Sequence, residues 1–234
     1  MRLTGERETL GLYLTGHPID RFESDLPRFV SARIGDLLSE RPLGASEARG
    51  FNAGKPTSVA GLIDEVRKRG QRTSMVLDDR SGRLEVTLFD EIYQQYRDLI
   101  AKDALVLVEG MLRFDEFTDG WRLAARRITD LHKVREEQVR RIVLRWPSQA
   151  NANTLLTRLA EVLAPWRGGA CQISVQYTGG GASGAFNLAA EWAVRPGREL
   201  LEHLEGLVGR DGLTLLYGPP PGLGHGPSFG AGRR

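Results

Sequence analysis

The sequence predicts a mainly β protein with an α+β second part, and three observations support this. Residues 59–131 contain five short apolar stretches separated by turn residues, with one helix-like stretch after the third. Residues 134–217 show a second alternation of strand-like and helix-like stretches. With 234 residues, the chain has a length that suits two small domains.

The first domain is expected at residues 51–133. Its third stretch has the clearest strand pattern, because three apolar residues alternate with polar ones: Leu84, Val86 and Leu88. The other four strands are expected at residues 59–66, 75–77, 105–108 and 121–131. A helix is expected before the fourth strand, with Asp90 as N-cap and apolar residues at helical spacing: Ile92, Tyr96, Leu99 and Ile100. This order is the pattern of the OB-fold, a five-stranded barrel that usually binds single-stranded nucleic acid or oligosaccharide.

The second domain is expected at residues 134–217, in the order β-α-β-β-α-β. Its strands are expected at residues 140–146, 171–177, 185–194 and 213–217. Two apolar stripes at helical spacing predict the helices: Leu155, Leu156, Leu159, Val162 and Leu163, then Leu200, Leu201, Leu204, Leu207 and Val208. The order favours a split-βαβ sandwich.

Two flanking segments complete the chain. Residues 1–50 are expected to be helical or irregular, with helical turns at 6–15 and 34–38. They hold too few apolar residues for a core of their own, so we expect them to dock on another part of the protein. Residues 218–234 are rich in Pro and Gly and are expected to be disordered.

Bulk composition excludes several classes of protein. The net charge of +2 is nearly balanced, unlike that of a protein that coats DNA. Cys171 is the single cysteine, so no internal disulfide can form and a reducing compartment is expected. Neither a membrane-length apolar run nor a signal-peptide core is present in the sequence. We therefore expect a cytoplasmic protein with no membrane partner.

Three sequence segments carry a resemblance to a known family. They are GERETLGLYLTGHPID at residues 5–20, LDDRSGRLEV at 77–86, and Val-Glu-Gly at 108–110 with Phe114. Together they resemble the C-terminal region of the bacterial DNA polymerase III alpha subunit, over residues 1–217. The second segment is less specific, because similar hairpins occur in anticodon-binding OB domains of aminoacyl-tRNA synthetases.

The resemblance implies a function and partners. The parent enzyme is a DNA-directed DNA polymerase that uses Mg²⁺, but in this family the polymerase carboxylates lie far upstream. We therefore expect a fragment or truncated reading frame that binds no cofactor and is inactive alone. By resemblance, the barrel contacts single-stranded template DNA, and the last domain binds the tau subunit of the clamp loader. The remainder of the polymerase III holoenzyme is the implied assembly.

Candidate nucleic-acid contacts fall in two groups around the barrel. The first is a basic cluster at the first hairpin, where OB-folds line their oligonucleotide groove: Arg67, Lys68, Arg69 and Arg72. The second is a set of aromatic residues that could stack on bases: Phe89, Phe114, Phe117 and Trp121. A solvated hairpin and barrel-end packing are the alternative interpretations. Residues 59–132 carry 12 Lys and Arg against 14 Asp and Glu, so any binding is expected to be weak and local.

Asp78 and Asp79 raise the possibility of a metal site, because paired carboxylates hold Mg²⁺ in polymerases. Adjacent residues on a strand point to opposite faces, however, and Asp-Arg-Ser-Gly favours a tight turn. We therefore predict a turn and no metal.

Two other functions remain open at this point. The barrel could be a tRNA-anticodon-binding OB module, although that would predict catalytic sequence after the barrel, where only a small sandwich is expected. The chain could also be a purely protein-interaction module with the barrel as a scaffold, which its acidic balance supports.

Overall fold

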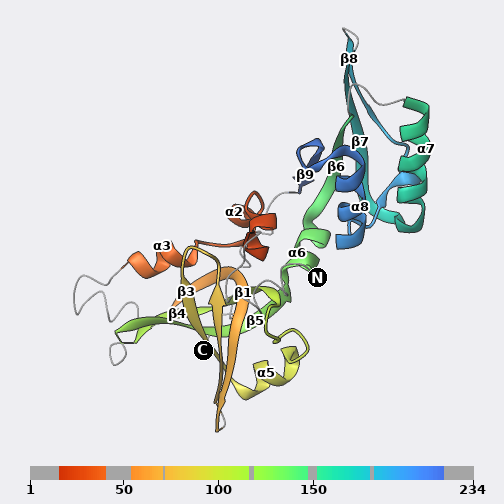
Figure 1. Ribbon diagram of the computed structural model, residues 1–234. Helices are drawn as coiled ribbons and strands as arrows, with labels where there is room; N and C mark the ends of the chain where they lie inside the picture. The colour runs from red at the N-terminus through yellow and green to blue at the C-terminus, as the bar shows by residue number, and fades with distance from the viewer. Residues whose placement is uncertain are drawn as a thin grey trace, which may run out of the picture. The chain divides into compact units, whose positions relative to one another are not determined.

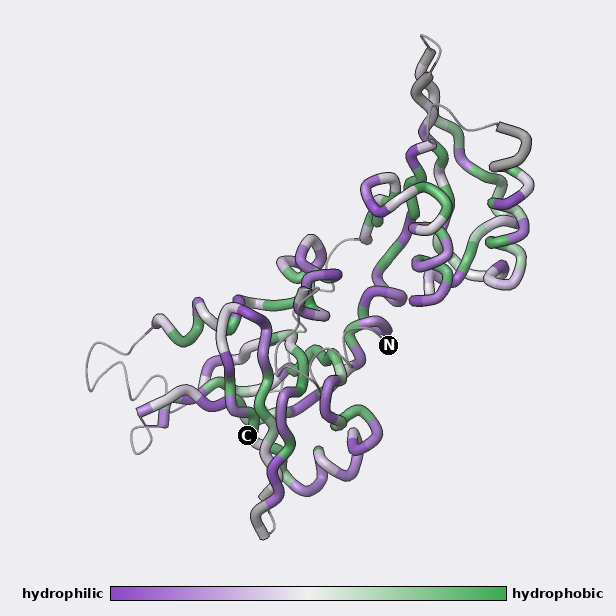
Figure 2. Tube along the Cα trace, in the orientation of Figure 1, coloured by the Kyte–Doolittle hydropathy of each residue, from purple (hydrophilic) through white to green (hydrophobic). Residues whose placement is uncertain are grey.

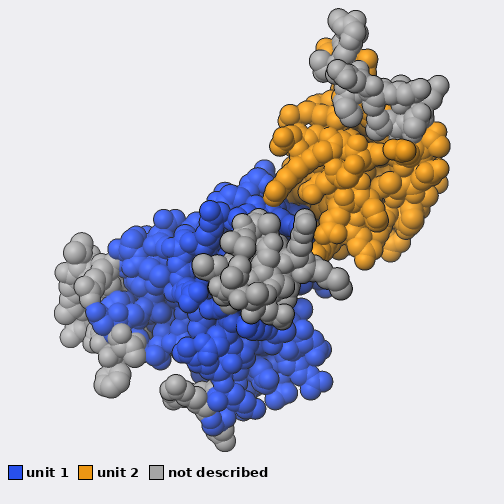
Figure 3. Space-filling model, viewed as in Figure 1, with its two compact units in different colours: residues 1–135 blue, residues 136–234 orange. Residues whose placement is uncertain are grey.

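The computed structural model describes residues 16–40, 54–70, 72–115, 119–146, 152–179 and 182–218. The chain divides into two compact units, residues 1–135 and 136–234 (Figure 3). The helical turn expected at residues 6–15 and the tail 219–234 lie outside the described residues.

The first unit contains a closed five-stranded barrel with the strand order β1-β2-β3-β5-β4 (Figure 1). Its strands are β1 (Lys55–Arg69), β2 (Arg72–Asp78), β3 (Arg83–Leu88), β4 (Leu105–Asp115) and β5 (Gly120–Asp130). The helix α5 (Asp90–Tyr96) lies between β3 and β4 in the chain. The predicted OB-fold is therefore confirmed.

The long strand β1 allows the barrel to close, because it pairs with two neighbours. Residues 55–62 pair with β4, and residues 62–69 pair with β2. A β-bulge between Ile63 and Glu65 lies just after Leu62, where the two halves meet, at the break that Asp64-Glu65 makes in the apolar run. Bulges bend a strand and increase its twist, which a small barrel requires. Parallel pairing of β3 with β5 completes the closure.

The barrel core follows from the alternation of apolar and polar residues along the strands (Figure 2). Leu84, Val86 and Leu88 are buried, as their spacing predicts. The helix α5 begins one residue earlier than the sequence predicts and ends at Tyr96, so Leu99 and Ile100 lie beyond it. Phe89 is its N-cap residue, with φ −72° and ψ 151°, and Asp90 lies in the first turn. A carboxylate in the first turn interacts favourably with the helix dipole. Asp90 therefore suits a first-turn position as well as the N-cap position.

The lead-in segment packs on the barrel, as expected. Its described residues, 16–40, contain the short helices η1 (Pro18–Phe22), α2 (Leu26–Phe29) and α3 (Ile34–Ser39). Ile34 and Leu37 belong to the barrel's own hydrophobic core. Arg135, the last residue of this unit in the sequence, donates from Nε to Oδ2 of Asp25 at 2.8 Å. Its guanidinium lies 3.8 Å from the centroid of the Phe22 ring.

The second unit has a four-stranded sheet with the order β8-β7-β6-β9. The helix α6 (Leu131–Gln138) leads into it from the first unit. Its elements are β6 (Val139–Trp146), α7 (Ala152–Leu163), η2 (Ala164–Trp166), β7 (Arg167–Gly179), β8 (Ala182–Asn187), η3 (Ala190–Trp192), α8 (Arg198–Val208), η4 (Arg210–Gly212) and β9 (Leu213–Tyr217). The β-α-β-β-α-β order is confirmed.

The strand arrangement departs from a split-βαβ sandwich. The parallel strands β6 and β7 are direct neighbours, whereas a split arrangement has another strand between them. The order of elements in the sequence does not determine which strands pair. The helices α7 and α8 pack on the same face of this sheet, around a core that includes Ile142, Leu144 and Ile173 (Figure 1).

Within the described residues, no helix is long and apolar enough to span a membrane.

Candidate nucleic-acid interface

The β1–β2 hairpin carries the predicted basic cluster at one end of the barrel. Its turn passes through Gly70, whose φ of +61° favours glycine. Arg67 and Lys68 are exposed near the end of β1. Arg69 and Arg72 pair across the hairpin, but their side chains lie outside the described part of the structure. The backbone therefore brings all four residues to one hairpin.

Arg67 is already engaged by a carboxylate. It donates from Nε and Nη2 to the two oxygens of Glu65, at 2.7 and 2.6 Å. These hydrogen bonds and the charge of Glu65 raise the pKa of Arg67. Both side chains are half exposed, so the pair is accessible to solvent. A phosphate would have to compete with Glu65 for this guanidinium.

Lys68 lies beside an aromatic ring that the sequence analysis did not identify. Its Nζ is 5.7 Å from the centroid of the Tyr93 ring, within the range of a cation–π contact. Tyr93 follows Phe89 by four residues, and its backbone N–H donates to the Phe89 carbonyl at 2.9 Å. The signal in the sequence that could have identified Tyr93 is its spacing of four residues from Phe89 at the start of a helix.

Phe89 is the most exposed large hydrophobic residue among those that the structure describes, with 63% of its surface accessible. Leu84, Val86 and Leu88 point into the core, so the adjacent residue points outward as predicted. An aromatic ring in this position can stack on a base. We use the name α5 platform for three residues at this end of the barrel: Tyr93 and Lys68, which are in contact, and Phe89, which immediately precedes α5.

The aromatic residues of the β4–β5 hairpin are placed differently. Trp121 is only 6% exposed, and its Nε1 donates to the Glu40 carbonyl at 3.0 Å. Phe114 is partly buried and makes an edge-to-face contact with Trp121, with ring centroids 5.2 Å apart. The ring of Trp121 is therefore used in packing, so we do not include these two residues in the proposed contact set. Phe117 lies outside the described residues.

Several other arginines on the outer surface of the barrel form ion pairs with carboxylates. Arg122 forms two ion pairs: its Nη1 lies 3.3 Å from Oδ2 of Asp115, and its Nε lies 3.7 Å from Oε2 of Glu85. Arg83 also forms an ion pair, with 3.0 Å between its Nε and Oδ2 of Asp78. This pairing agrees with the balanced charge of the barrel. Lys68 differs from these arginines, because its neighbour is the aromatic ring of Tyr93.

Asp78 and Asp79 form a turn, as predicted. Asp79 is buried, and its two carboxylate oxygens accept five hydrogen bonds, from the backbone N–H groups of Ile34, Ser81 and Gly82, the Ser81 hydroxyl and Arg33 Nε. Such a carboxylate has no capacity left for a metal ion. Among the described residues, no group of three acidic, His or Cys side chains could hold one.

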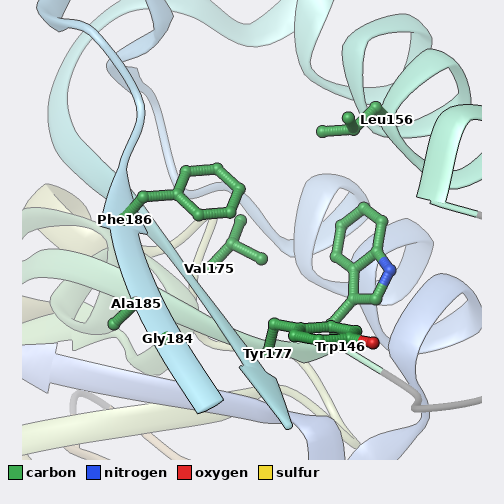
Figure 4. Close-up of a pocket in the computed structure, with 7 residues that line it drawn as sticks. All are labelled: Trp146, Leu156, Val175, Tyr177, Gly184, Ala185 and Phe186. Carbon is green, nitrogen blue, oxygen red and sulfur yellow. The ribbon is translucent and has the colours of Figure 1, made fainter. Parts of the chain in front are cut away.

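The second unit contains an apolar pocket of about 390 Å³ (Figure 4). It lies between α7 and the helix-side face of the sheet, and its lining is mainly aromatic and aliphatic: Trp146, Leu156, Val175, Tyr177, Gly184, Ala185 and Phe186. Leu156 and Phe186 are 43% and 46% exposed, so the pocket opens to solvent. Exposed apolar surface of this kind often marks a protein-binding site.

Cys171 lies in the core of the second unit. Burial raises the pKa of its thiol to about 11. A thiol that remains protonated near neutral pH is a poor nucleophile, so Cys171 is a packing residue, the default interpretation of its position in the sequence.

Comparisons with known proteins agree with both units. Residues 57–131 match a family described as OB-fold nucleic acid binding domain. Residues 158–209 match a family described as DNA polymerase III subunit alpha, C-terminal domain.

Curated relatives match along most of the chain. The DNA polymerase III subunit alpha of Escherichia coli is 37% identical over 222 residues, which cover 92% of this chain and 18% of that protein. The same subunit of Vibrio cholerae is 36% identical over 222 residues, covering 93% of this chain and 18% of that protein. The chain therefore spans about a fifth of the length of these relatives. A solved structure of asparaginyl-tRNA synthetase from Pyrococcus horikoshii covers 37% of this chain, and this chain covers 22% of that one, at 17% identity and a TM-score of 0.31.

Proposed function

The chain is homologous to the C-terminal region of bacterial DNA polymerase III alpha subunits, and from this premise we propose that its barrel binds single-stranded template DNA. The α5 platform carries the proposal. It combines an exposed aromatic ring at Phe89 with a cation at Lys68. Proteins that bind single strands without sequence preference use this combination of a stacking surface and a positive charge.

The charges of the barrel support weak binding that depends on salt. Arg67 is held by Glu65, so Lys68 is the stronger candidate for a first phosphate contact. Arg69 and Arg72 on the same hairpin are proposed to add contacts. Each phosphate neutralised on a single strand contributes about 0.7 to the slope of log affinity against log salt concentration.

Fluorescence anisotropy of labelled oligo-dT at two salt concentrations tests the proposal. We expect salt-sensitive binding that weakens with Lys68→Glu, Arg69→Glu and Phe89→Ala. Absence of binding at low salt would leave the barrel as a scaffold in a protein-interaction module. Preference for a tRNA anticodon stem-loop over oligo-dT would support the tRNA-binding alternative instead.

For the second unit we propose docking of the clamp-loader tau subunit. The apolar pocket lined by Trp146, Leu156 and Phe186 supports this, because it offers a partly exposed surface for an apolar side chain of a partner. Analytical ultracentrifugation of the chain with purified tau tests it. Undiminished binding of a folded Phe186→Ala variant would rule out the pocket as the docking site.

In the complete polymerase, these two interactions would support DNA-directed DNA synthesis within the holoenzyme. The chain spans about a fifth of its relatives, and we assign primer extension and its Mg²⁺ requirement to the remainder of such a subunit. A primer-extension assay with nucleoside triphosphates and Mg²⁺ is expected to detect no synthesis by this chain alone.

A further inference from the structure

The sheet of the second unit has an unusual charge composition. Its four strands contain Arg140, Arg141, Arg145 and Arg167 but no Asp or Glu. The barrel strands differ, because they contain carboxylates as well as arginines, and several of these form ion pairs. A sheet with cations and no acids creates a positive surface wherever its side chains face solvent.

Among the described residues of this unit, the helices α7 and α8 both lie on one face of the sheet. Ile142, Leu144 and Ile173 point toward α7 and α8, so the alternate residues point to the opposite face. Hydrogen bonds between neighbouring strands confirm the assignment: Arg141 Nη2 donates to Gln172 Oε1 at 2.7 Å, and Ser174 Oγ lies 2.6 Å from Asn187 Oδ1. We call the polar residues of this face the open sheet face: Arg141, Arg145, Gln172, Ser174, Gln176 and Asn187. The strand register places the apolar residues Val143 and Leu216 on the same face.

In the described part of the chain, no ion pair neutralises the cations of the open sheet face. The Arg141 side chain is hydrogen-bonded to an uncharged amide, and the Arg145 side chain has neither a hydrogen bond nor an ion pair with another described residue. Arg145, Gln172, Gln176 and Asn187 are all exposed. Arg141 and Arg145 lie four residues apart on one strand, a separation of about 13 Å.

We propose that the open sheet face binds the phosphate backbone of single-stranded nucleic acid. Guanidinium, amide and hydroxyl groups are the side chains that commonly contact phosphate and sugar. The face has no aromatic ring among its members, so the contact is independent of base stacking and of sequence. This site is separate from the α5 platform and does not depend on the function proposed for the barrel.

Charge reversal in the full 234-residue chain tests the proposal. The variant is Arg141→Glu/Arg145→Glu, and the matched control is Arg158→Glu/Arg198→Glu, which makes the same change of charge at exposed positions of α7 and α8. Binding of labelled oligo-dT is measured by anisotropy between 20 and 200 mM salt, in steps of about twofold. Thermal unfolding shows whether each variant is folded, and Arg141→Gln/Arg145→Gln serves if charge reversal prevents folding.

We expect the open-face variant to bind at least about tenfold more weakly at low salt, while the control binds as the parent chain does. Loss of two phosphate contacts should also make the slope of log affinity against log salt shallower by about 1.4. An equal loss in the control would show a general charge effect and overturn the proposal, as would unchanged binding by the open-face variant.

Two further results distinguish the sites and the class of partner. If Lys68→Glu and Phe89→Ala bind normally while the open-face variant does not, the barrel proposal fails and this one stands. If oligo-dT binding is unchanged but binding of poly-glutamate is lost in the open-face variant, the face recognises an acidic protein segment and the nucleic-acid assignment is overturned.

Discussion

Arg33 holds Asp79 through two donors: its Nε reaches the Oδ2 carboxylate oxygen at 2.9 Å, and its Nη2 reaches the backbone carbonyl at 2.7 Å. Asp79 also accepts the N–H of Ile34 at 2.9 Å and thereby caps the first turn of α3 from a different part of the chain. The lead-in segment and the β2–β3 turn are therefore joined through one buried carboxylate.

Removing this carboxylate should strongly destabilise the first unit. We expect Asp79→Ala to lower the free energy of unfolding by about 3 kcal/mol, because five donors lose their acceptor. Arg33→Ala should cost less, since Arg33 is partly exposed. A double-mutant cycle measured by urea unfolding should give a coupling of about 1–3 kcal/mol between the two residues. Strictly additive effects would contradict the direct interaction.

The same contact predicts a dependence of stability on pH. Burial alone would raise the pKa of Asp79, but hydrogen bonds from Ser81, Ile34 and Arg33 outweigh it and lower this pKa below its ordinary value of 3.8. The stabilisation is therefore complete above the unfolded-state pKa and is lost as the pH falls through the lower, folded-state value.

The measurement compares unfolding of the parent chain and Asp79→Asn at pH 7, pH 4 and pH 3. The parent should lose more stability than the variant on acidification, because the variant has no proton to gain at this position. Parallel pH profiles would show that another carboxylate dominates acid sensitivity.

The Arg33–Asp79 contact also shows what the sequence could and could not predict. The barrel follows from local alternation, as at Leu84, Val86 and Leu88. Asp79 was correctly assigned to a turn for the same reason, since turn chemistry is local. Its partner lies 46 residues away and has no periodic pattern, so only folding brings the two together.

The candidate site was predictable to a similar degree. Phe89 follows from the strand alternation, whereas Tyr93 beside Lys68 depends on how α5 packs against the hairpin. The hydrogen bond of Trp121 joins it to the Glu40 carbonyl, 81 residues away in the chain. The adjacency of β6 and β7 is likewise a matter of strand pairing that the order of elements does not specify.

Releasing Arg67 should increase affinity for single-stranded DNA. Glu65→Gln removes the charge that holds the guanidinium, so Arg67 becomes available to a phosphate. The slope of log affinity against log salt should become steeper by about 0.7. Glu161→Gln, an exposed position on α7, is the matched control. Equal gains in both variants would mean that net charge, and not Arg67, is responsible.

Two exposed phenylalanines should separate the two proposed functions. Phe89→Ala should weaken oligo-dT binding about 5- to 150-fold, the equivalent of about 1–3 kcal/mol of base stacking, and should leave tau binding unchanged. Phe186→Ala should have the opposite pattern, because its ring lines the pocket of the second unit. Anisotropy and ultracentrifugation on the same two preparations give the comparison. Loss of both activities in either variant would indicate misfolding and require thermal unfolding data.

Gly110 should be intolerant of even a methyl group. A Cβ at this position would lie 2.2 Å from the Ala124 carbonyl oxygen, at the β-bulge between Glu109 and Gly110 where β4 pairs with β5. Because backbone atoms of two paired strands cannot separate cheaply, Gly110→Ala should destabilise the barrel by about 2–3 kcal/mol. This explains on steric grounds why glycine ends the Val-Glu-Gly segment at residues 108–110.

Gly206 provides the control for that substitution. It lies within α8, and a Cβ there would meet no atom within 4 Å. Gly206→Ala should therefore raise the free energy of unfolding of the second unit by about 0.5–1 kcal/mol, through the higher helix propensity of alanine. Urea unfolding of both variants measures the contrast. If Gly110→Ala were as stable as the parent chain, the close approach of β4 and β5 at the bulge would be wrong, since no rearrangement of side chains can remove a clash with a backbone oxygen.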